Sequence, residues 1–343
     1  YKALLAEKKL AATQARRKEN EYEQPSHAGF VLKIALKNFP LLEDPQDEKD
    51  GLVWRRFRVS GGITLNALQD RIIQSVMGFG RRYHSYYFCD LRDGACFGPQ
   101  GEAYIDDMHK SMQGLFFEDD RLYRLADILS KPGDSLRYTY DLGDQFEHLL
   151  ILEEIVPDDE TFELIDGALA GPPEDSNGCA DKGTRGYYQL LRDVKQKGAD
   201  AMTEALREAA GAANVKASQL DSRGRFQPFR FEVMEHRFAV QAALSEPLGA
   251  HTASMPRLQT YKFSRDTGFS SSSRPAPFGS AATVYDPETL GLTALCGVCA
   301  TPHALKNCSK CKQAKFCSKA CLEVGWPLHK KQCKKMAAAA ARK

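Results

Sequence analysis

Residues 27–247 alternate short apolar runs with turn-forming residues, which is the pattern of a packed domain. Runs rich in β-branched and aromatic residues predict strands, because such side chains fit a pleated, half-buried surface. The predicted strands are 30–36, 53–59, 86–88, 135–142 and 146–156. Gly143 and Asp144 predict the turn that joins the last two strands.

Helical spacing of apolar positions follows the second of these strands. Thr64 is a candidate N-cap for a helix. Behind it, apolar residues recur every three or four positions: Leu65, Leu68, Ile72, Ile73 and Val76. Further helices are predicted at 187–194, 199–212 and 229–244. The segment 27–247 therefore contains both strands and helices.

Changes of composition divide the chain into five segments. Residues 1–26 are a basic lead-in of helix-favouring composition, for which we expect a solvated helix; an arm that binds nucleic acid is the alternative. After the packed segment 27–247, residues 248–292 contain a serine run and a Pro-Ala-Pro sequence, which predict a flexible linker. Residues 293–336 carry a cysteine cluster, and 337–343 form a basic, Ala-rich tail. Such a linker would let the cysteine-rich unit move independently.

The composition is that of a soluble globular protein, with 43% hydrophobic and 27% charged residues. No run approaches the ~18 apolar residues that a membrane span needs. Seven of the ten cysteines lie close together near the C-terminus. Disulfide scaffolds are the competing explanation, but they belong mostly to small secreted chains, so we expect an intracellular protein of the nucleus or cytoplasm. Because the first residue is Tyr1 rather than Met, we expect the natural chain to begin upstream.

The net charge of +2 conceals an uneven distribution. From Cys296 onward there are eleven Lys or Arg residues and one acidic residue, Glu323, which makes this part +10 and the rest of the chain −8. The thiolates of a metal-binding unit would reduce the positive charge without reversing it. The chain is thus an acidic body with a basic appendage.

The cysteine cluster has the spacing of zinc ligands. It reads Cys296-x2-Cys299-x8-Cys308-x2-Cys311-x5-Cys317-x3-Cys321-x7-His329-x3-Cys333. Zinc takes four tetrahedral nitrogen or sulfur ligands, and a two-residue gap lets one tight turn supply two of them. Eight ligands therefore predict two closed sites with no position left for water or substrate, so both zinc ions should be structural.

This pattern closely resembles the MYND-type zinc finger family. The likeness extends to Phe316-Cys317-Ser318 and to a tryptophan, Trp326, ahead of His329. The resemblance implies interleaved pairs. One zinc ion would be held by Cys296, Cys299, Cys317 and Cys321, and the other by Cys308, Cys311, His329 and Cys333.

Related fingers bind short proline-containing peptides beside the tryptophan, so the resemblance implies that Trp326 contacts a peptide. Leu322 is a second candidate contact, at a position where the family often has glutamine. The alternative for Trp326 is a core aromatic packed between the zinc sites. Four lysines could contact phosphate, although solvated lysines are the commoner case: Lys330, Lys331, Lys334 and Lys335.

The segment 27–247 resembles a second family, named after the third open reading frame of a root-inducing plasmid. The likeness rests on Trp54-Arg55-Arg56 with the Thr64 helix start and His84, on the run Tyr138 to His148, and on Pro172-Pro173-Glu174-Asp175 followed by Gly186-Tyr187. Leu142 and Phe146 depart from the Phe and Trp that are usual in the family. The resemblance implies an α+β fold, with a curled mixed β-sheet and helices, and carries no established activity.

Polar residues of these motifs are the candidates for chemistry in the body. They are His84, Asp141, Asp144, His148 and Glu174, with Asp175 beside them. Such groups bind metals or move protons. The structural alternative is stronger, because Asp and Gly satisfy backbone groups at a strand turn and buried His and Asp often only hydrogen-bond. The sequence contains no phosphate-binding loop and no GxSxG motif.

The sequence therefore predicts an intracellular, non-enzymatic adaptor with two structural zinc ions per chain. Its finger would bind a protein or peptide, and the body would bind a further partner. Nucleic acid is a less favoured partner, and no membrane partner is expected. The alternative is an enzyme or nucleic-acid-acting factor whose site is the cluster of His84, Asp141, Asp144, His148 and Glu174.

Overall fold

The computed structural model describes most of the chain outside the predicted linker. The described residues are 2–18, 24–37, 52–100, 104, 106, 109–110, 116–174, 183–246 and 293–340. The predicted linker 248–292 lies outside them. None of the described helices is both long and apolar enough to cross a membrane.

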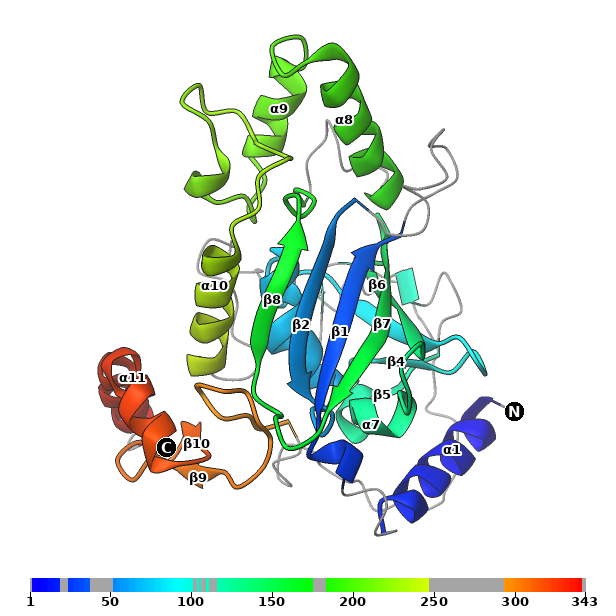
Figure 1. Ribbon diagram of the computed structural model, residues 1–343, viewed down its shortest axis with the longest axis vertical. Coiled ribbons are helices and arrows are strands. Elements are labelled where there is room, and N and C mark those ends of the chain that lie inside the picture. The colour runs from blue at the N-terminus through cyan, green and yellow to red at the C-terminus, as the bar shows by residue number, and fades with distance from the viewer. Residues whose placement is uncertain are drawn as a thin grey trace, which may run out of the picture.

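A mixed β-sheet forms the centre of the body (Figure 1). Among the described residues it has eight strands in the order β5-β4-β3-β6-β7-β1-β2-β8. The strands are β1 Gly29–Leu36, β2 Trp54–Ser60, β3 Tyr86–Asp90, β4 Cys96–Gly98, β5 Glu118–Asp119, β6 Ser135–Tyr140, β7 Phe146–Val156 and β8 Glu163–Ala168. Neighbours pair antiparallel except β4 and β5, which are parallel. The predicted fold class, a mixed sheet with helices, is confirmed.

The two faces of the sheet differ because side chains alternate along each strand. On β2, Arg55, Phe57 and Val59 are buried, whereas the residues between them are half-buried. The outer face carries ion pairs across strands, such as Arg56 Nε to Glu153 Oε2 at 2.6 Å. One face therefore builds the core and the other is polar.

Helices cover the apolar face. The helical segment predicted after Thr64 is a continuous run of α4 Leu65–Ala67, the π-helix η1 Leu68–Ile73 and α5 Gln74–Met77, and it lies behind the sheet in Figure 1. The Thr64 side chain accepts a hydrogen bond from the Ala67 N–H, as an N-cap does. The run ends at Gly78, whose φ of +85° is a left-handed conformation that suits glycine.

The remaining elements surround this core. They are α1 Lys2–Arg16, η2 Asp120–Leu122, α7 Leu125–Ile128, α8 Gly183–Lys197, α9 Thr203–Ala210, η3 Ala217–Gln219, α10 Val233–Ser245, β9 Lys306–Asn307, β10 Lys315–Phe316 and α11 Lys319–Ala340. The three later predicted helices correspond to α8, α9 and α10. β4, β5 and β8 were not predicted, because the first two are very short and β8 mixes charged residues with glycine. Helix α11 extends through most of the predicted tail, to Ala340.

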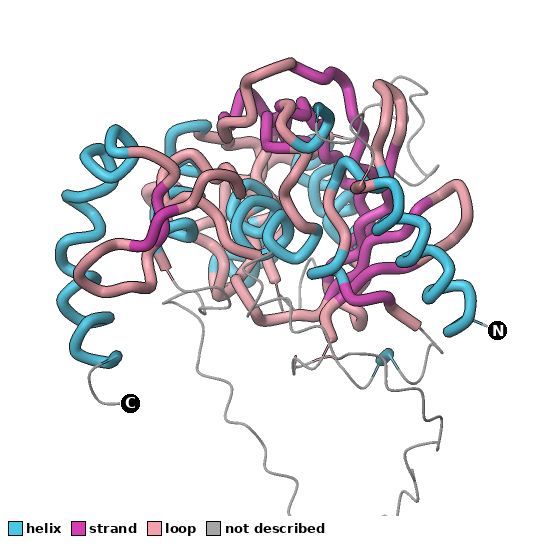
Figure 2. Tube along the Cα trace, turned by 90° about the horizontal axis from the view of Figure 1, so that it is seen from below, coloured by secondary structure: helices cyan, strands magenta, loops and turns pink. Residues whose placement is uncertain are grey.

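The N-terminal helix packs on the body through part of its surface, while most of its described side chains are exposed. Lys9 Nζ lies 3.3 Å from Asp90 Oδ2, and Arg17 forms an ion pair with Asp127. Thr13 is buried, and Leu10 packs against the main core. Lys9 of α1 and Arg17, which directly follows it, thus pair with carboxylates of the body. In Figure 2, α1 and α11 stand at opposite ends of the molecule.

Candidate metal centres

The first predicted quartet is assembled where a loop and the start of α11 meet. Cys296, Cys299, Cys317 and Cys321 each offer a sulfur, and the four sulfurs lie within 4.8 Å of one another. The Cys299 sulfur is 3.5 Å from that of Cys317 and 3.9 Å from that of Cys321. Two sulfurs on a tetrahedral zinc ion, with bonds of about 2.3 Å, lie about 3.8 Å apart. The quartet therefore fits zinc.

The second quartet is more deeply buried and combines three sulfurs with one imidazole. It consists of Cys308, Cys311, His329 and Cys333. The Cys308 and Cys333 sulfurs lie 3.9 Å apart, and the Cys311 sulfur is 3.6 Å from His329 Nε2. A mixed sulfur–nitrogen edge on tetrahedral zinc is about 3.6 Å. Two zinc ions per chain thus fit the two clusters, as predicted.

The finger needs these metals because its own core is small. Its buried cluster consists of Cys308, Cys311, Phe316 and Cys333, so three of its four members are metal ligands. Four protein ligands at each site leave no open position, which is the arrangement of structural rather than catalytic zinc.

The candidate polar residues of the body do not meet at one place. His84 Nδ1 lies 3.4 Å from Asp141 Oδ2. Glu174 instead accepts hydrogen bonds from the Gly80 N–H at 2.9 Å and from the Tyr140 hydroxyl at 2.8 Å. Of the five predicted residues only His84 and Asp141 bring ligand atoms together among the described residues, so convergence of all five into one site is not observed.

His148 and Asp144 are the remaining described members of the predicted cluster. The His148 ring is buried and packs against Phe79 and Tyr138, with ring centroids 5.6 and 5.4 Å away. Asp144 lies on the turn between β6 and β7, and Asp175 lies outside the described residues. Sequence reasoning missed Asp106, whose carboxylate is 3.8 Å from His84 Nδ1. No motif surrounds Asp106, so only the fold reveals its place.

Comparison with known proteins agrees with both sequence resemblances. The profile of the plasmid pRiA4b ORF-3-like protein family matches residues 45–235, which is more than half of the chain. The chain belongs to the plasmid pRiA4b ORF-3-like family. The MYND finger profile matches residues 296–333. Neither family description names a catalytic activity.

Individual relatives cover the chain unevenly. Over 38 residues the chain is 50% identical to dauer abnormal formation protein 25 of Caenorhabditis elegans, a match of 11% of this chain and 10% of that protein. The chain therefore spans about a tenth of the length of this relative. A protein of unknown function from Methanosarcina mazei Go1 has a similar solved structure. It is 22% identical, with a TM-score of 0.40, and the match covers 61% of this chain and 97% of that one.

The MYND finger is docked against the pRiA4b ORF-3-like domain, contrary to the expectation of an independently moving unit. The backbone N–H of Phe162 donates to the carbonyl of Cys299 at 2.9 Å. The Gln241 side chain of α10 donates to the Val298 carbonyl at 2.8 Å. The Thr301 hydroxyl donates to the Glu160 carboxylate. The domain thus contacts the loop that carries the first two zinc ligands.

His303 is the second point of docking. Its ring stacks on His27 at a centroid distance of 3.7 Å, and its Nε2 lies 2.9 Å from the Ser26 carbonyl. A Cβ at Gly62 would come within 2.6 Å of His303 Nε2, so glycine is required for this approach. The turn Ser60-Gly61-Gly62 therefore accommodates a side chain of the finger, which sequence alone did not indicate.

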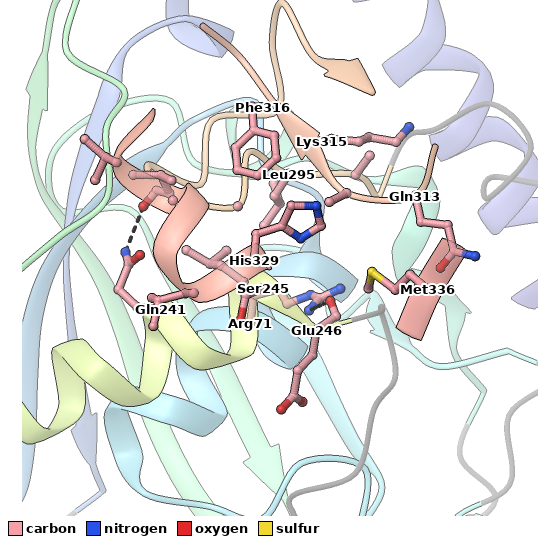
Figure 3. A pocket seen from close by; sticks show the side chains of 18 of the residues that line it. Arg71, Gln241, Ser245, Glu246, Leu295, Gln313, Lys315, Phe316, His329 and Met336 are labelled. Carbon is pink, nitrogen blue, oxygen red and sulfur yellow. Dashed lines mark hydrogen bonds between the residues drawn. The ribbon is translucent and has the colours of Figure 1, made fainter. Parts of the chain in front are cut away.

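A cavity of about 570 Å³ lies between the finger and the domain (Figure 3). Gln241 and Ser245 of α10 line one side, and Phe316, Val324 and Leu328 of the finger line the other. Figure 3 shows His329, a zinc ligand, at the centre of this wall. Trp326 is not among the lining residues; it is 38% exposed elsewhere on α11.

We expect the domain to lose stability in mild acid because of two buried histidines. Burial, with a contribution from the charge of Arg55, lowers the pKa of His148 and of His236 to about 3. The unfolded chain takes up both protons near pH ~6.5, whereas the folded rings stay neutral. Stability is therefore fully present above that pH and falls as pH decreases. At pH ~5 each ring should cost about 2 kcal/mol.

The measurement is urea unfolding of the full chain between pH ~7.5 and ~5, compared with a His236→Gln variant. His236 Nδ1 lies 3.1 Å from the Ser75 carbonyl, and the glutamine amide can donate to the same oxygen. The variant should lose about half of the acid-induced change in free energy of unfolding. An unchanged pH dependence in the variant would contradict the assignment.

Proposed function

We propose that the protein is a zinc-dependent adaptor in which the docked MYND finger presents a peptide-binding surface centred on Trp326. The observation that carries this proposal is the exposure of Trp326, at 38%, on a helix that zinc ligands hold in place. Its ring lies 5.9 Å from that of the ligand His329, so the metal site fixes its position. A rigid, partly exposed tryptophan is the type of residue that anchors protein interfaces.

Leu322 is the second residue of the proposed peptide-binding surface. It is one helical turn before Trp326 on α11, and residues four apart share a helix face. Leu322 is half-buried against the finger core, so it would form the inner wall of a groove whose outer wall is Trp326. Val324 and Leu328 lie on a different face, the one that lines the cavity toward α10.

The charge of the finger favours a peptide with acidic residues around its apolar contact. Lys330, Lys331, Lys334 and Lys335 follow Trp326 on the same helix. Rim charges of this kind steer association and contribute little to affinity once the complex has formed. The pRiA4b ORF-3-like domain would act as the platform that orients the finger and as the binding site for a further partner. In this proposal the platform spans 27–247 and the finger 293–336.

The test is a binding titration against a library of proline-containing peptides, with a random DNA duplex in parallel. Trp326→Ala should weaken peptide binding by about 2 kcal/mol, roughly 30-fold, because an anchor residue is truncated. Leu328→Ala is the matched control: it removes an exposed apolar side chain of the same helix from the cavity face. It should have a much smaller effect, and both variants should keep two zinc ions.

Replacing Lys334 and Lys335 together separates a peptide from a nucleic-acid partner. Affinity for a duplex would depend on these charges and fall steeply with salt, because phosphate contacts release counterions. Peptide affinity should change little. Tight duplex binding that needs the lysines and survives the loss of Trp326 would overturn the proposal.

A further inference from the structure

Three metal-ligating side chains meet inside the pRiA4b ORF-3-like domain, far in sequence from the finger. They are His84, Asp106 and Asp141, and all three are buried. His84 lies just before β3, Asp141 directly follows β6, and Asp106 comes from the segment after β4. One ligand atom from each lies within 4.8 Å of the others. Three separate parts of the chain thus bring one imidazole and two carboxylates to one point.

One of the two spacings from His84 matches that of ligands around an ion, and the other is slightly longer. His84 Nδ1 is 3.4 Å from Asp141 Oδ2 and 3.8 Å from Asp106 Oδ2. A charge-assisted hydrogen bond between imidazole and carboxylate would be shorter, about 2.7–2.9 Å. Nitrogen and oxygen ligands on a tetrahedral metal, with bonds of about 2.0–2.2 Å, lie about 3.3–3.6 Å apart. The ligand spacings of the two finger sites follow from tetrahedral geometry in the same way, with longer zinc–sulfur bonds.

Backbone groups hold both carboxylates in this geometry. Asp106 accepts hydrogen bonds from the N–H groups of Ser85 at 2.7 Å and Leu142 at 2.6 Å. Asp141 accepts through Oδ1 from Gly143 at 2.8 Å and Asp144 at 3.0 Å, which leaves Oδ2 directed at His84. Such outer contacts orient metal ligands in known sites.

The charges also favour a cation. Among the described residues, no Lys or Arg forms an ion pair with either carboxylate; the nearby basic groups are the imidazoles of His84 and His109. A divalent ion would balance two carboxylates and a neutral imidazole without leaving a net charge in the interior.

His109 lies near the cluster without joining its three ligand atoms. A Cβ placed on Gly143 would be 3.2 Å from Asp141 Oδ1 and 3.4 Å from His109 Nε2, so the glycine allows the ring to approach this turn. His109 is positioned by its backbone N–H, which donates to the Asp106 carbonyl at 3.0 Å.

We propose that His84, Asp106 and Asp141 form a third metal site, for a divalent first-row transition ion. Imidazole and carboxylate together suit Zn²⁺, Mn²⁺, Fe²⁺ or Co²⁺, whereas Mg²⁺ and Ca²⁺ prefer oxygen ligands alone. The bound ion would tie Asp106 to the start of β3 and the end of β6. This site is independent of the function proposed for the finger.

The experiment uses the full chain with both finger sites filled by zinc. Dialysis against citrate, a weak chelator, should leave two zinc ions per chain, because thiolate sites bind more tightly. Titration with Co²⁺ should then fill one further equivalent. Its visible spectrum should lack thiolate-to-cobalt charge transfer, and X-ray absorption should show nitrogen and oxygen neighbours without sulfur.

Two variants and a control locate the ion. His84→Gln and Asp141→Asn should each weaken cobalt binding by more than about 100-fold, since loss of even an outer partner costs about 10- to 100-fold. Asp144→Asn changes the same turn outside the cluster and should retain the third equivalent. Melting of each protein without cobalt checks that the variants are folded.

Three results would overturn the proposal. The first is folded wild-type protein that takes up no more than two metal ions at millimolar cobalt. The second is uptake that persists in both His84→Gln and Asp141→Asn. The third is a third ion with sulfur neighbours, which would place it at Cys89 and Cys96, paired across β3 and β4.

Discussion

Replacing Cys311 with Ala should empty the second zinc site and unfold the finger while the body stays folded. The Cys311 sulfur is buried and shares its site with His329 and Cys333, both on α11. Structural zinc contributes about 10–16 kcal/mol to the folding of comparable fingers at neutral pH. The apolar core of the finger cannot compensate, because three of its four buried members are ligands of this site.

Metal analysis and hydrogen exchange measure this outcome. Zinc should fall from two ions per chain to one or none, and amides of α11 should lose protection. The amides of β1 and β7 should keep it, because these strands belong to the separate large core. Cys96→Ala is the matched control, since Cys96 is a half-buried thiol outside both quartets. Two retained zinc ions in Cys311→Ala would refute the assignment.

Replacing Arg55 with Met should destabilise the body by about 3–5 kcal/mol. Arg55 is completely buried on β2, and its guanidinium stacks on Phe231 at 4.0 Å from the ring centroid. Burial lowers its pKa to about 9, so it remains charged at neutral pH. The charge is stabilised by hydrogen bonds of 2.7–2.9 Å to four backbone carbonyls, those of Trp54, Val76, Ala168 and Leu169.

Methionine has a similar length and fits a buried site, but it donates no hydrogen bond. Without the guanidinium, the carbonyls at the ends of α5 and β8 would be buried with no hydrogen-bond donor. Each such carbonyl lowers the stability by about 1–3 kcal/mol where no other donor replaces the guanidinium. Urea unfolding gives the change in free energy. Arg56→Met is the control on the adjacent residue, because Arg56 pairs with Glu153 at a half-exposed position and should contribute at most about 1 kcal/mol. Equal effects of the two substitutions would contradict this account.

The sequence alone predicted the elements whose information is local. Strand positions follow from the alternation of apolar residues, and the helix after Thr64 from a cap and a periodic apolar stripe. The zinc ligands could be predicted for the same reason, since the members of each pair are three or four positions apart and need only a turn or a helical face to meet. How the pairs combine into two quartets came from the family resemblance.

Only the tertiary structure decided which distant residues meet. His84, Asp141, His148 and Glu174 come from three motifs, and of these the fold brings only His84 and Asp141 into one cluster of ligand atoms among the described residues. Asp106, which no motif marks, completes the cluster with His84 and Asp141. A shift of one residue in strand register turns each side chain of that strand to the opposite face, and composition does not determine the register.

The docking of the finger and of α1 on the body likewise could not be predicted from the sequence. A long segment with a serine run between two units predicts that the units move separately. Its composition says nothing about whether their surfaces are complementary, so their docking could not be predicted. The contacts of Glu160 with Thr301 and of Ser26 with His303 join residues more than a hundred positions apart. The sequence determined the local elements and the metal ligands of this protein. Long-range packing decided how these parts meet, because such contacts depend on the geometry of the whole chain and not on neighbouring residues.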